Sequence, residues 1–238
     1  MIEMKGWCVC AILFINLNLI KYNLGGTKNM NEFTIDAILN GVPASVANMQ
    51  LPDPDLRDYY RDETDRVFWI DSNVDDNTLD LVKMIIHCNR EDKGKNVEDR
   101  TPIKVMINSG GGDVQVMLTI IKTMKVSKTP VYTVVFSSAM SAAAEILAAG
   151  HKRYAFPGTC VMVHSGSCSY GGTMEQAESC KKYVDSLTKR ATDEFVKNTK
   201  IDAKTLKKKG ASDWYMDENE ALEKGVVDAI ITDLDEIF

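Results

Sequence analysis

The chain has 238 residues, of which 45% are hydrophobic and 26% charged, and it is long enough to bury a core without disulfide staples. Its formal net charge of −6 repels phosphate backbones, which argues against binding of nucleic acid. Six cysteines in a chain of this length, several within strand-like or helix-like patterns, are typical of a reducing, cytoplasmic compartment.

The first part of the chain carries the apolar run 7–20, which also contains two asparagines. A membrane-spanning helix needs about twenty apolar residues, so we expect no membrane association. A lysine precedes the run, as in a signal peptide, but no Ala-x-Ala-like cleavage site follows it. We interpret residues 1–29 as an extension ahead of a second start at Met30, with a targeting segment as the alternative. One domain is expected over residues 30–238.

From Arg66 onward the pattern sharpens into strands and helices. Compact apolar runs predict strands at 67–70, 103–107, 131–136 and 160–163, and a last short strand is expected at 229–231. Helical periodicity predicts helices at 78–88, 114–124, 141–149 and 174–198. Alternation of strands and helices predicts a single-domain α/β fold with a largely parallel sheet.

Two local signals predict helix ends. Gly150 follows the 141–149 helix in the position that suits a left-handed C-cap. Asp217 and Glu220 have the spacing of a capping box ahead of a helix at 218–224.

Three features with chemical potential follow three of the predicted strands. A glycine triplet, 110–112, comes after strand 103–107, Ser141 comes after strand 131–136, and His164 comes after strand 160–163. Ligands of open α/β sheets bind beyond the carboxyl ends of the strands. We therefore expect these three features to meet at one site.

Ser141 begins an alanine-rich helix. A hydroxyl becomes a useful nucleophile when a base takes its proton and hydrogen-bond donors stabilise the oxyanion that follows. A helix start has unpaired N–H groups, which makes the N–H of Ala142 a candidate oxyanion donor. Gly111 or Gly112 is a candidate for the second donor, because glycine lets a backbone come close to a substrate. The pattern predicts acyl transfer, with peptide bonds as the favoured substrate.

Ser141 also has a plain structural interpretation. Serine is a favoured N-cap, and Ser137 and Ser138 are placed to serve the same purpose. The residues around Ser141 are not Gly-x-Ser-x-Gly, which excludes the nucleophile elbow of the α/β-hydrolases.

His164 is the candidate base among three histidines. His87 lies within an amphipathic helix and His151 follows a helix end, so both have ordinary structural interpretations. His164 and Cys168 lack the second pair that a zinc site needs, and no metal is expected. The glycine triplet is not followed by Gly-Lys-Ser/Thr, so no nucleotide or other cofactor is expected.

A third residue must orient the imidazole. Among the acids downstream, Asp217 is assigned to a helix cap, and Asp228 lies in the turn before the last strand. Asp213, just ahead of Trp214, has no such role and is our candidate.

Several motifs in order resemble the Clp protease proteolytic subunit family, the ClpP-type serine peptidases. The resemblance runs from DRVFWIDSNVDD through INSGGGDV, SSAMSAAAEILAAG, YAFPGTCVMVH and SYGG to DWYMDENEALEKGVVDAI. It implies the ClpP/crotonase-like fold, with Ser141 as nucleophile, His164 as base and Asp213 as orienting acid. It also implies that Gly111 and Ala142 supply the oxyanion N–H groups.

The same resemblance implies an assembly. Members form heptameric rings stacked face to face, the 174–198 helix would be the protruding handle that joins two rings, and an unfoldase ATPase of the AAA+ type would deliver protein substrates. The chain departs from the family's Ser-Pro-Gly-Gly and from Met-Gly after the nucleophile, as phage-encoded or specialised members do.

The leading hypothesis is therefore a serine endopeptidase of an ATP-dependent compartmentalised protease. Two alternatives belong to other classes. One is a catalytically silent ring subunit with a structural role, which an intact triad disfavours. The other is a crotonase-like acyl-CoA enzyme, which would need no serine–histidine pair.

Overall fold

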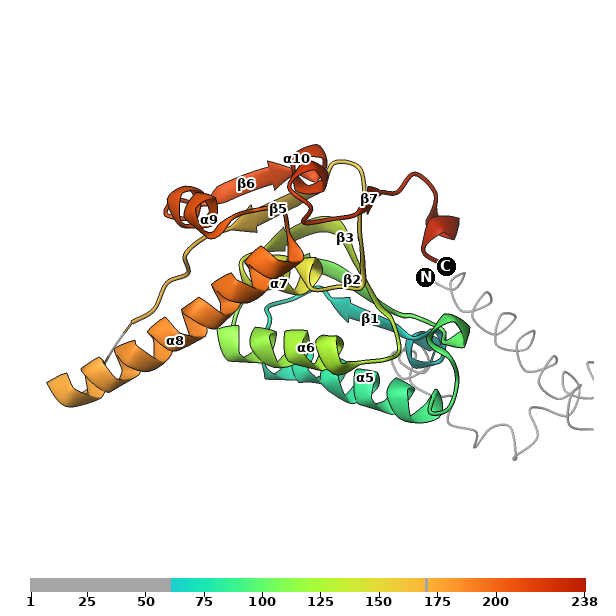
Figure 1. Cartoon of the computed structure of the whole chain (residues 1–238), viewed down its shortest axis with the longest axis horizontal. Helices are drawn as coiled ribbons and strands as arrows, with labels where there is room; N and C mark the ends of the chain where they lie inside the picture. Colours follow the sequence, from blue (N-terminus) through green and yellow to red (C-terminus); the bar gives the residue numbers. More distant parts are fainter. Residues whose placement is uncertain (1–60, 170) are drawn as a thin grey trace, which may run out of the picture. The chain divides into compact units, whose positions relative to one another are not determined.

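The computed structural model describes residues 61–169 and 171–238, which all belong to one compact unit (Figure 1). The expected extension 1–29 and the second start at Met30 lie outside the described residues.

A mostly parallel sheet forms the centre of this unit. Its strands are β1 (Val67–Ile70), β2 (Ile103–Ser109), β3 (Val131–Met140), β4 (Lys152–Ala155), β5 (Cys160–Val163), β6 (Trp214–Asp217) and β7 (Ala229–Ile230). Strands β1, β2, β3, β4 and β7 follow one another in this order with parallel pairing, whereas β6 runs antiparallel to β5. The predicted α/β class and the largely parallel sheet are confirmed.

Helices connect the strands and cover one face of the sheet (Figure 1). They are α5 (Asp80–Glu91), α6 (Val114–Val126), α7 (Ala142–Ala148), α8 (Met174–Asn198), α9 (Ala203–Lys209) and α10 (Glu218–Glu223). The predicted 174–198 helix is confirmed at both ends. The predicted 78–88 helix instead starts as a 3₁₀ turn, Asp76–Leu79, because Asp75 caps that turn, and α5 then continues to Glu91.

Strand β3 is longer than predicted, and it divides the sheet. Its first half, from Tyr132 to Val135, pairs with β4, and its second half, from Ser138 to Met140, pairs with β5. Ser137 and Ser138, expected as possible helix caps, therefore lie within a strand. The second half of β3 brings the end of β5 beside the start of α7.

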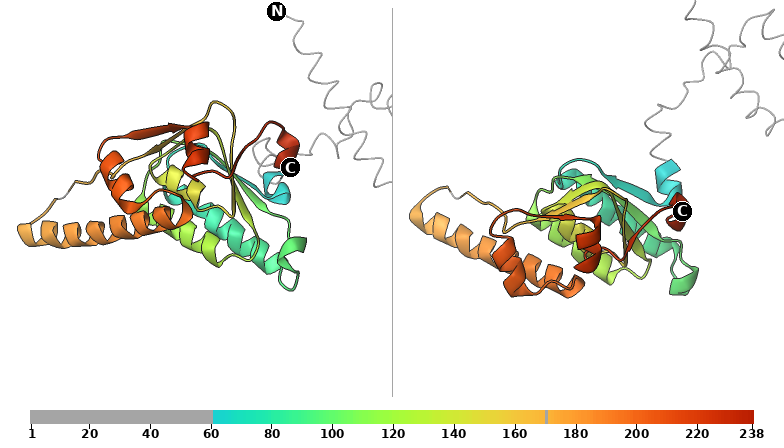
Figure 2. Two further views of the ribbon diagram at one scale, coloured as in Figure 1. Left: turned by 45° about the horizontal axis from the view of Figure 1, so that its top comes forward. Right: turned by 90° about the horizontal axis from the view of Figure 1, so that it is seen from above.

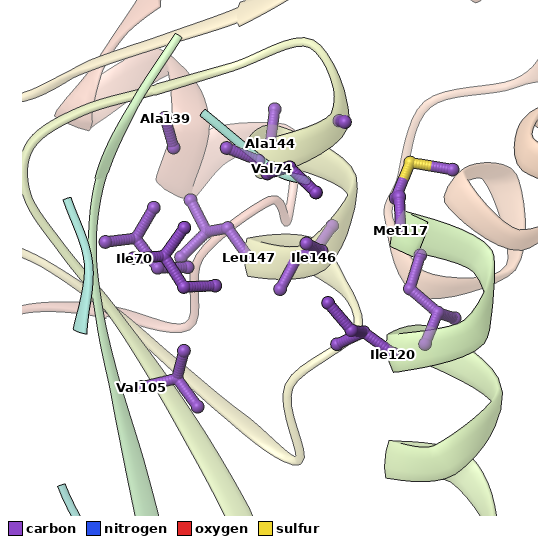
Figure 3. Packing of buried hydrophobic residues seen from close by; sticks show 14 of the residues in the cluster. Ile70, Val74, Val105, Met117, Ile120, Ala139, Ala144, Ile146 and Leu147 are labelled. Carbon is purple, nitrogen blue, oxygen red and sulfur yellow. The ribbon is translucent and has the colours of Figure 1, made fainter. Parts of the chain in front are cut away.

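The main core lies between the sheet and helices α5 to α8. Figure 3 shows Ala144, Ile146 and Leu147 of α7 among side chains of the sheet and of α6, and all three are fully buried. Alternation along β2 sends Val105 and Ile107 into this core and Met106 into a smaller cluster on the opposite face of the sheet.

The two predicted helix ends differ from expectation. Gly150 does not adopt a left-handed conformation. It is glycine for a different reason, because an added Cβ would lie 2.3 Å from Oγ1 of Thr133. Asp217 does cap α10 by accepting the N–H of Glu220 at 2.7 Å. The reciprocal half of the capping box is missing, because the Glu220 carboxylate accepts the Nε1–H of Trp214 at 3.2 Å instead.

Helix α8 projects from the body of the unit (Figures 1 and 2). Only its second half is buried, through Leu187, Ala191 and Phe195. The first half is largely exposed, including 83% of Met174 and 51% of Tyr183. Across the described residues, no helix combines the length and apolar character that crossing a membrane would require.

Candidate active site

Ser141 lies at a sharp turn between β3 and α7. Its backbone has φ 53° and ψ −122°, a left-handed conformation that is strained for any residue with a Cβ. The turn is held to β5, because the N–H of Ser141 donates to the carbonyl of Met162 at 2.8 Å. Ala139 and Ala143 are fully buried two residues to either side. The absence of Gly-x-Ser-x-Gly excluded the hydrolase motif, but alanines at both positions still permit a strained strand-to-helix turn at the serine.

The hydroxyl of Ser141 does not cap the helix. Ser141 occupies the N-cap position of α7, but its side chain makes no capping hydrogen bond. Its Oγ lies instead 2.8 Å from Nε2 of His164. Ser141 is therefore the N-cap of α7 by position, but the interpretation of its side chain as a helix cap is wrong.

The pairing of β5 with β6 brings His164 and Asp213 together. These strands are antiparallel, with Val163 opposite Trp214, so His164 and Asp213 leave the two strands side by side. Nδ1 of His164 lies 3.5 Å from Oδ1 of Asp213, longer than a normal hydrogen bond. The side chain of His164 is 26% exposed and that of Asp213 is 52% exposed, so the carboxylate is largely hydrated.

Ser165 adds a contact that the sequence did not reveal. Both its N–H and its hydroxyl donate to the carbonyl of Gly210, at 2.7 and 2.8 Å. Gly210 lies three residues before Asp213, and an added Cβ there would be 3.6 Å from the backbone of His164. The segment after the histidine is thereby fastened to the segment that carries the aspartate.

The glycine triplet packs against the turn at Ser141. Gly111 has φ 96°, and an added Cβ would lie 2.5 Å from the carbonyl oxygen of Met140 and 2.7 Å from Cβ of Ser141. Only glycine fits there. The N–H of Gly111 donates to Oγ of Ser109 at 3.1 Å.

Gly112 has a packing role of its own. An added Cβ would lie 2.2 Å from the carbonyl oxygen of Val74, in the segment after β1. Val74 also donates its N–H to the carbonyl of Gly111 at 3.0 Å and accepts the N–H of Asp113 at 2.7 Å. These bonds hold the glycine turn between β1 and the start of α7. Ala142 adjoins the turn, and among the described residues its N–H has no hydrogen-bond acceptor.

Glu145 is an acidic residue of α7 to which no sequence pattern assigned a role. Its Oε2 atom is buried and has no hydrogen-bond partner among the described residues. Burial raises the pKa of this carboxyl to about 7. The described residues contain no group of three or more histidine, cysteine or acidic side chains placed to bind a metal ion.

A hydroxyl, an imidazole and a carboxylate in this order are the functional groups of serine hydrolases. The sequence profile of the family described as Clp protease matches residues 58–233, and the chain belongs to this family. The ATP-dependent Clp protease proteolytic subunit of Deinococcus radiodurans is 34% identical over 131 residues. That similarity covers 54% of this chain and 64% of the relative, slightly less than two thirds of its length.

Proposed function

We propose that this chain is a serine endopeptidase, the proteolytic subunit of an ATP-dependent compartmentalised protease. The observation that carries the proposal is the 2.8 Å approach of Ser141 Oγ to His164 Nε2, at a strained turn between a strand and a helix. With Nδ1 protonated and facing Asp213, Nε2 is free to take the hydroxyl proton.

In the proposed mechanism, Oγ of Ser141 attacks the carbonyl carbon of the scissile peptide while its proton passes to Nε2 of His164. The tetrahedral oxyanion accepts the free N–H of Ala142. Gly111 is the second donor, once its N–H exchanges Ser109 Oγ for the oxyanion. The imidazolium then protonates the leaving amine, and water hydrolyses the acyl-enzyme by the same steps.

The exposure of the Asp213 side chain allows the size of its contribution to catalysis to be predicted. We expect Asp213→Asn to lower kcat by about 10²-fold, less than the ~10⁴-fold seen for a buried triad aspartate. The reason is that water can replace much of what this exposed carboxylate contributes. Steady-state peptide hydrolysis by the variant and the wild type checks this expectation. A loss as large as that of a Ser141 variant would show that Asp213 acts as a tightly coupled member of the site.

Assembly with further copies and with an ATPase is part of the proposal. The projecting half of α8 exposes Met174 and Tyr183, which supports its packing against another copy of the chain. The family resemblance adds stacked heptameric rings. The sequence lacks the Gly-x-x-x-x-Gly-Lys-Ser/Thr loop that binds ATP phosphates, so unfolding of substrates requires a separate AAA+ partner.

Two substrates test this proposal together. We expect slow hydrolysis of a short fluorogenic peptide without nucleotide, and degradation of a stably folded reporter protein only with an ATPase partner and ATP. A fluorophosphonate should label Ser141 of the wild type. No labelling would favour a silent ring subunit or an acyl-CoA enzyme, and rapid degradation of the folded reporter by the chain alone would contradict the compartment.

A further inference from the structure

The carboxylate of Asp213 is held only loosely by its own contacts. Its Oδ1 lies 3.5 Å from Nδ1 of His164, and its Oδ2 lies 3.5 Å from the hydroxyl of Tyr215. Both distances exceed those of normal hydrogen bonds, and among the described residues this carboxylate has no closer hydrogen-bond partner. The position of Asp213 beside the imidazole therefore depends on how its backbone is attached to the segment that carries His164.

Two backbone attachments enclose the histidine and the aspartate. On one side, β5 and β6 pair with Val163 opposite Trp214. On the other side, Ser165 binds the carbonyl of Gly210. The histidine lies between these attachments on one segment, and residues 211–213 lie between them on the other. Because the second segment is the longer of the two, the place of the aspartate depends on where Gly210 is held.

Ser165 holds the Gly210 carbonyl with two donors. Its N–H lies 2.7 Å and its hydroxyl 2.8 Å from the carbonyl oxygen, which has a lone pair for each of them. A carbonyl held by one donor can still turn about that hydrogen bond, whereas two donors fix its direction. Supporting hydrogen bonds of this kind hold catalytic groups within about 0.5 Å of their working geometry.

We infer that Ser165 is a positioning residue, whose hydroxyl sets the approach of the Asp213 carboxylate to the imidazole of His164. This inference rests on the proposed peptidase function. The hydroxyl contacts Gly210 rather than a reacting atom, so its effect reaches the reaction through Asp213. Because the carboxylate is already 3.5 Å from the imidazole, any retreat weakens its attraction for the imidazolium that forms when His164 takes the serine proton.

The test compares Ser165→Thr with Ser165→Val in peptide hydrolysis by the full chain. Both substitutions introduce a side chain that is branched at Cβ, but only the first retains a hydroxyl. We expect Ser165→Thr to keep the kcat of wild type and Ser165→Val to lower it about 5-fold, which corresponds to the ~1 kcal/mol of one hydrogen bond. KM should stay unchanged, because the lost interaction matters only once the imidazolium forms. The matched control is Ser167→Val, at an exposed position of the same loop, which should leave kcat unchanged.

A double-mutant cycle shows whether the hydroxyl acts through the aspartate. In an Asp213→Asn background we expect Ser165→Val to lower kcat by less than about 2-fold, since no carboxylate remains to be positioned. An equal loss in both backgrounds would mean that the hydroxyl merely supports the local structure, and it would overturn the inference. A raised KM with unchanged kcat would also overturn it, because it would place Ser165 in contact with the substrate.

Failure of this inference can be told apart from failure of the proposed function. If wild type cleaves the peptide and Ser165→Val is as active as Ser165→Thr, the positioning role is wrong while the peptidase activity stands. If wild type neither cleaves the peptide nor reacts with a fluorophosphonate, the proposed function fails and the inference with it. Should Ser165→Val not fold, Ser165→Ala removes the hydroxyl without adding bulk, and the same 5-fold loss of kcat is expected of it.

Discussion

Replacing Ser141 with alanine is expected to lower peptide hydrolysis by about 10⁴-fold or more and to abolish fluorophosphonate labelling. The hydroxyl is the sole nucleophile in the proposed mechanism, and it lies 2.8 Å from Nε2 of His164. The fold should persist, because this hydroxyl makes no helix-capping bond whose loss would destabilise α7. Hydrolysis by the alanine variant at a rate near that of wild type would contradict the mechanism.

A second substitution at the same position separates chemistry from backbone strain. Ser141→Gly removes the same hydroxyl but also the Cβ that makes φ 53° unfavourable. We expect the glycine variant to be as inactive as the alanine variant but more stable by about 1 kcal/mol, the lower range for a strained residue. Chemical denaturation at one protein concentration measures the difference. A glycine variant less stable than the alanine variant would show that the turn stores no strain.

Ser141 and His164 could be chosen from the sequence as the candidate nucleophile and the candidate base because both come after predicted buried strands. Compact apolar runs are a local signal: His164 comes directly after the run 160–163, and Ser141 is separated from the run 131–136 by four residues. No local sequence signal marks the end of β3 at Met140. The segment Ser-Ser-Ala-Met continues the strand because β5 supplies hydrogen-bonding partners for it, and only the folded sheet reveals that pairing.

Asp213 depends on tertiary structure in the same way. It comes beside His164 through the register of two strands that are far apart in the chain, and the candidate could be chosen from sequence only by assigning other acids to other roles. Glu145 gave no signal, since a single glutamate in an alanine-rich helix is normally a solvated residue. Its buried oxygen becomes apparent only when the packing of α7 is known.

At the opposite end of the strands, a buried charge cluster ties several elements together. The Asp92 side chain is fully buried and accepts from both terminal nitrogens of Arg66, at 2.6 and 3.1 Å. Thr129 Oγ1 and Lys95 Nζ also donate to it, at 3.0 and 2.8 Å. Arg66 precedes β1, Asp92 follows α5, and Thr129 precedes β3. One carboxylate thus joins three chain segments.

We expect Asp92→Asn to destabilise the fold by about 3 kcal/mol at pH 7, because it leaves the largely buried guanidinium of Arg66 with only the exposed carboxylate of Glu91 as counter-charge. The Arg66 hydrogen bonds hold the pKa of Asp92 well below its usual value of 3.8. The stability that Asp92 contributes is therefore full above pH 3.8 and is lost as the pH falls below it, so the difference between variant and wild type should shrink at pH 3. Denaturant titrations at pH 7 and pH 3 measure this, with Asp71→Asn as the exposed control. If the free energies of unfolding of variant and wild type differ equally at pH 7 and pH 3, the charge of Asp92 does not stabilise the fold, and the packing of its side chain alone does.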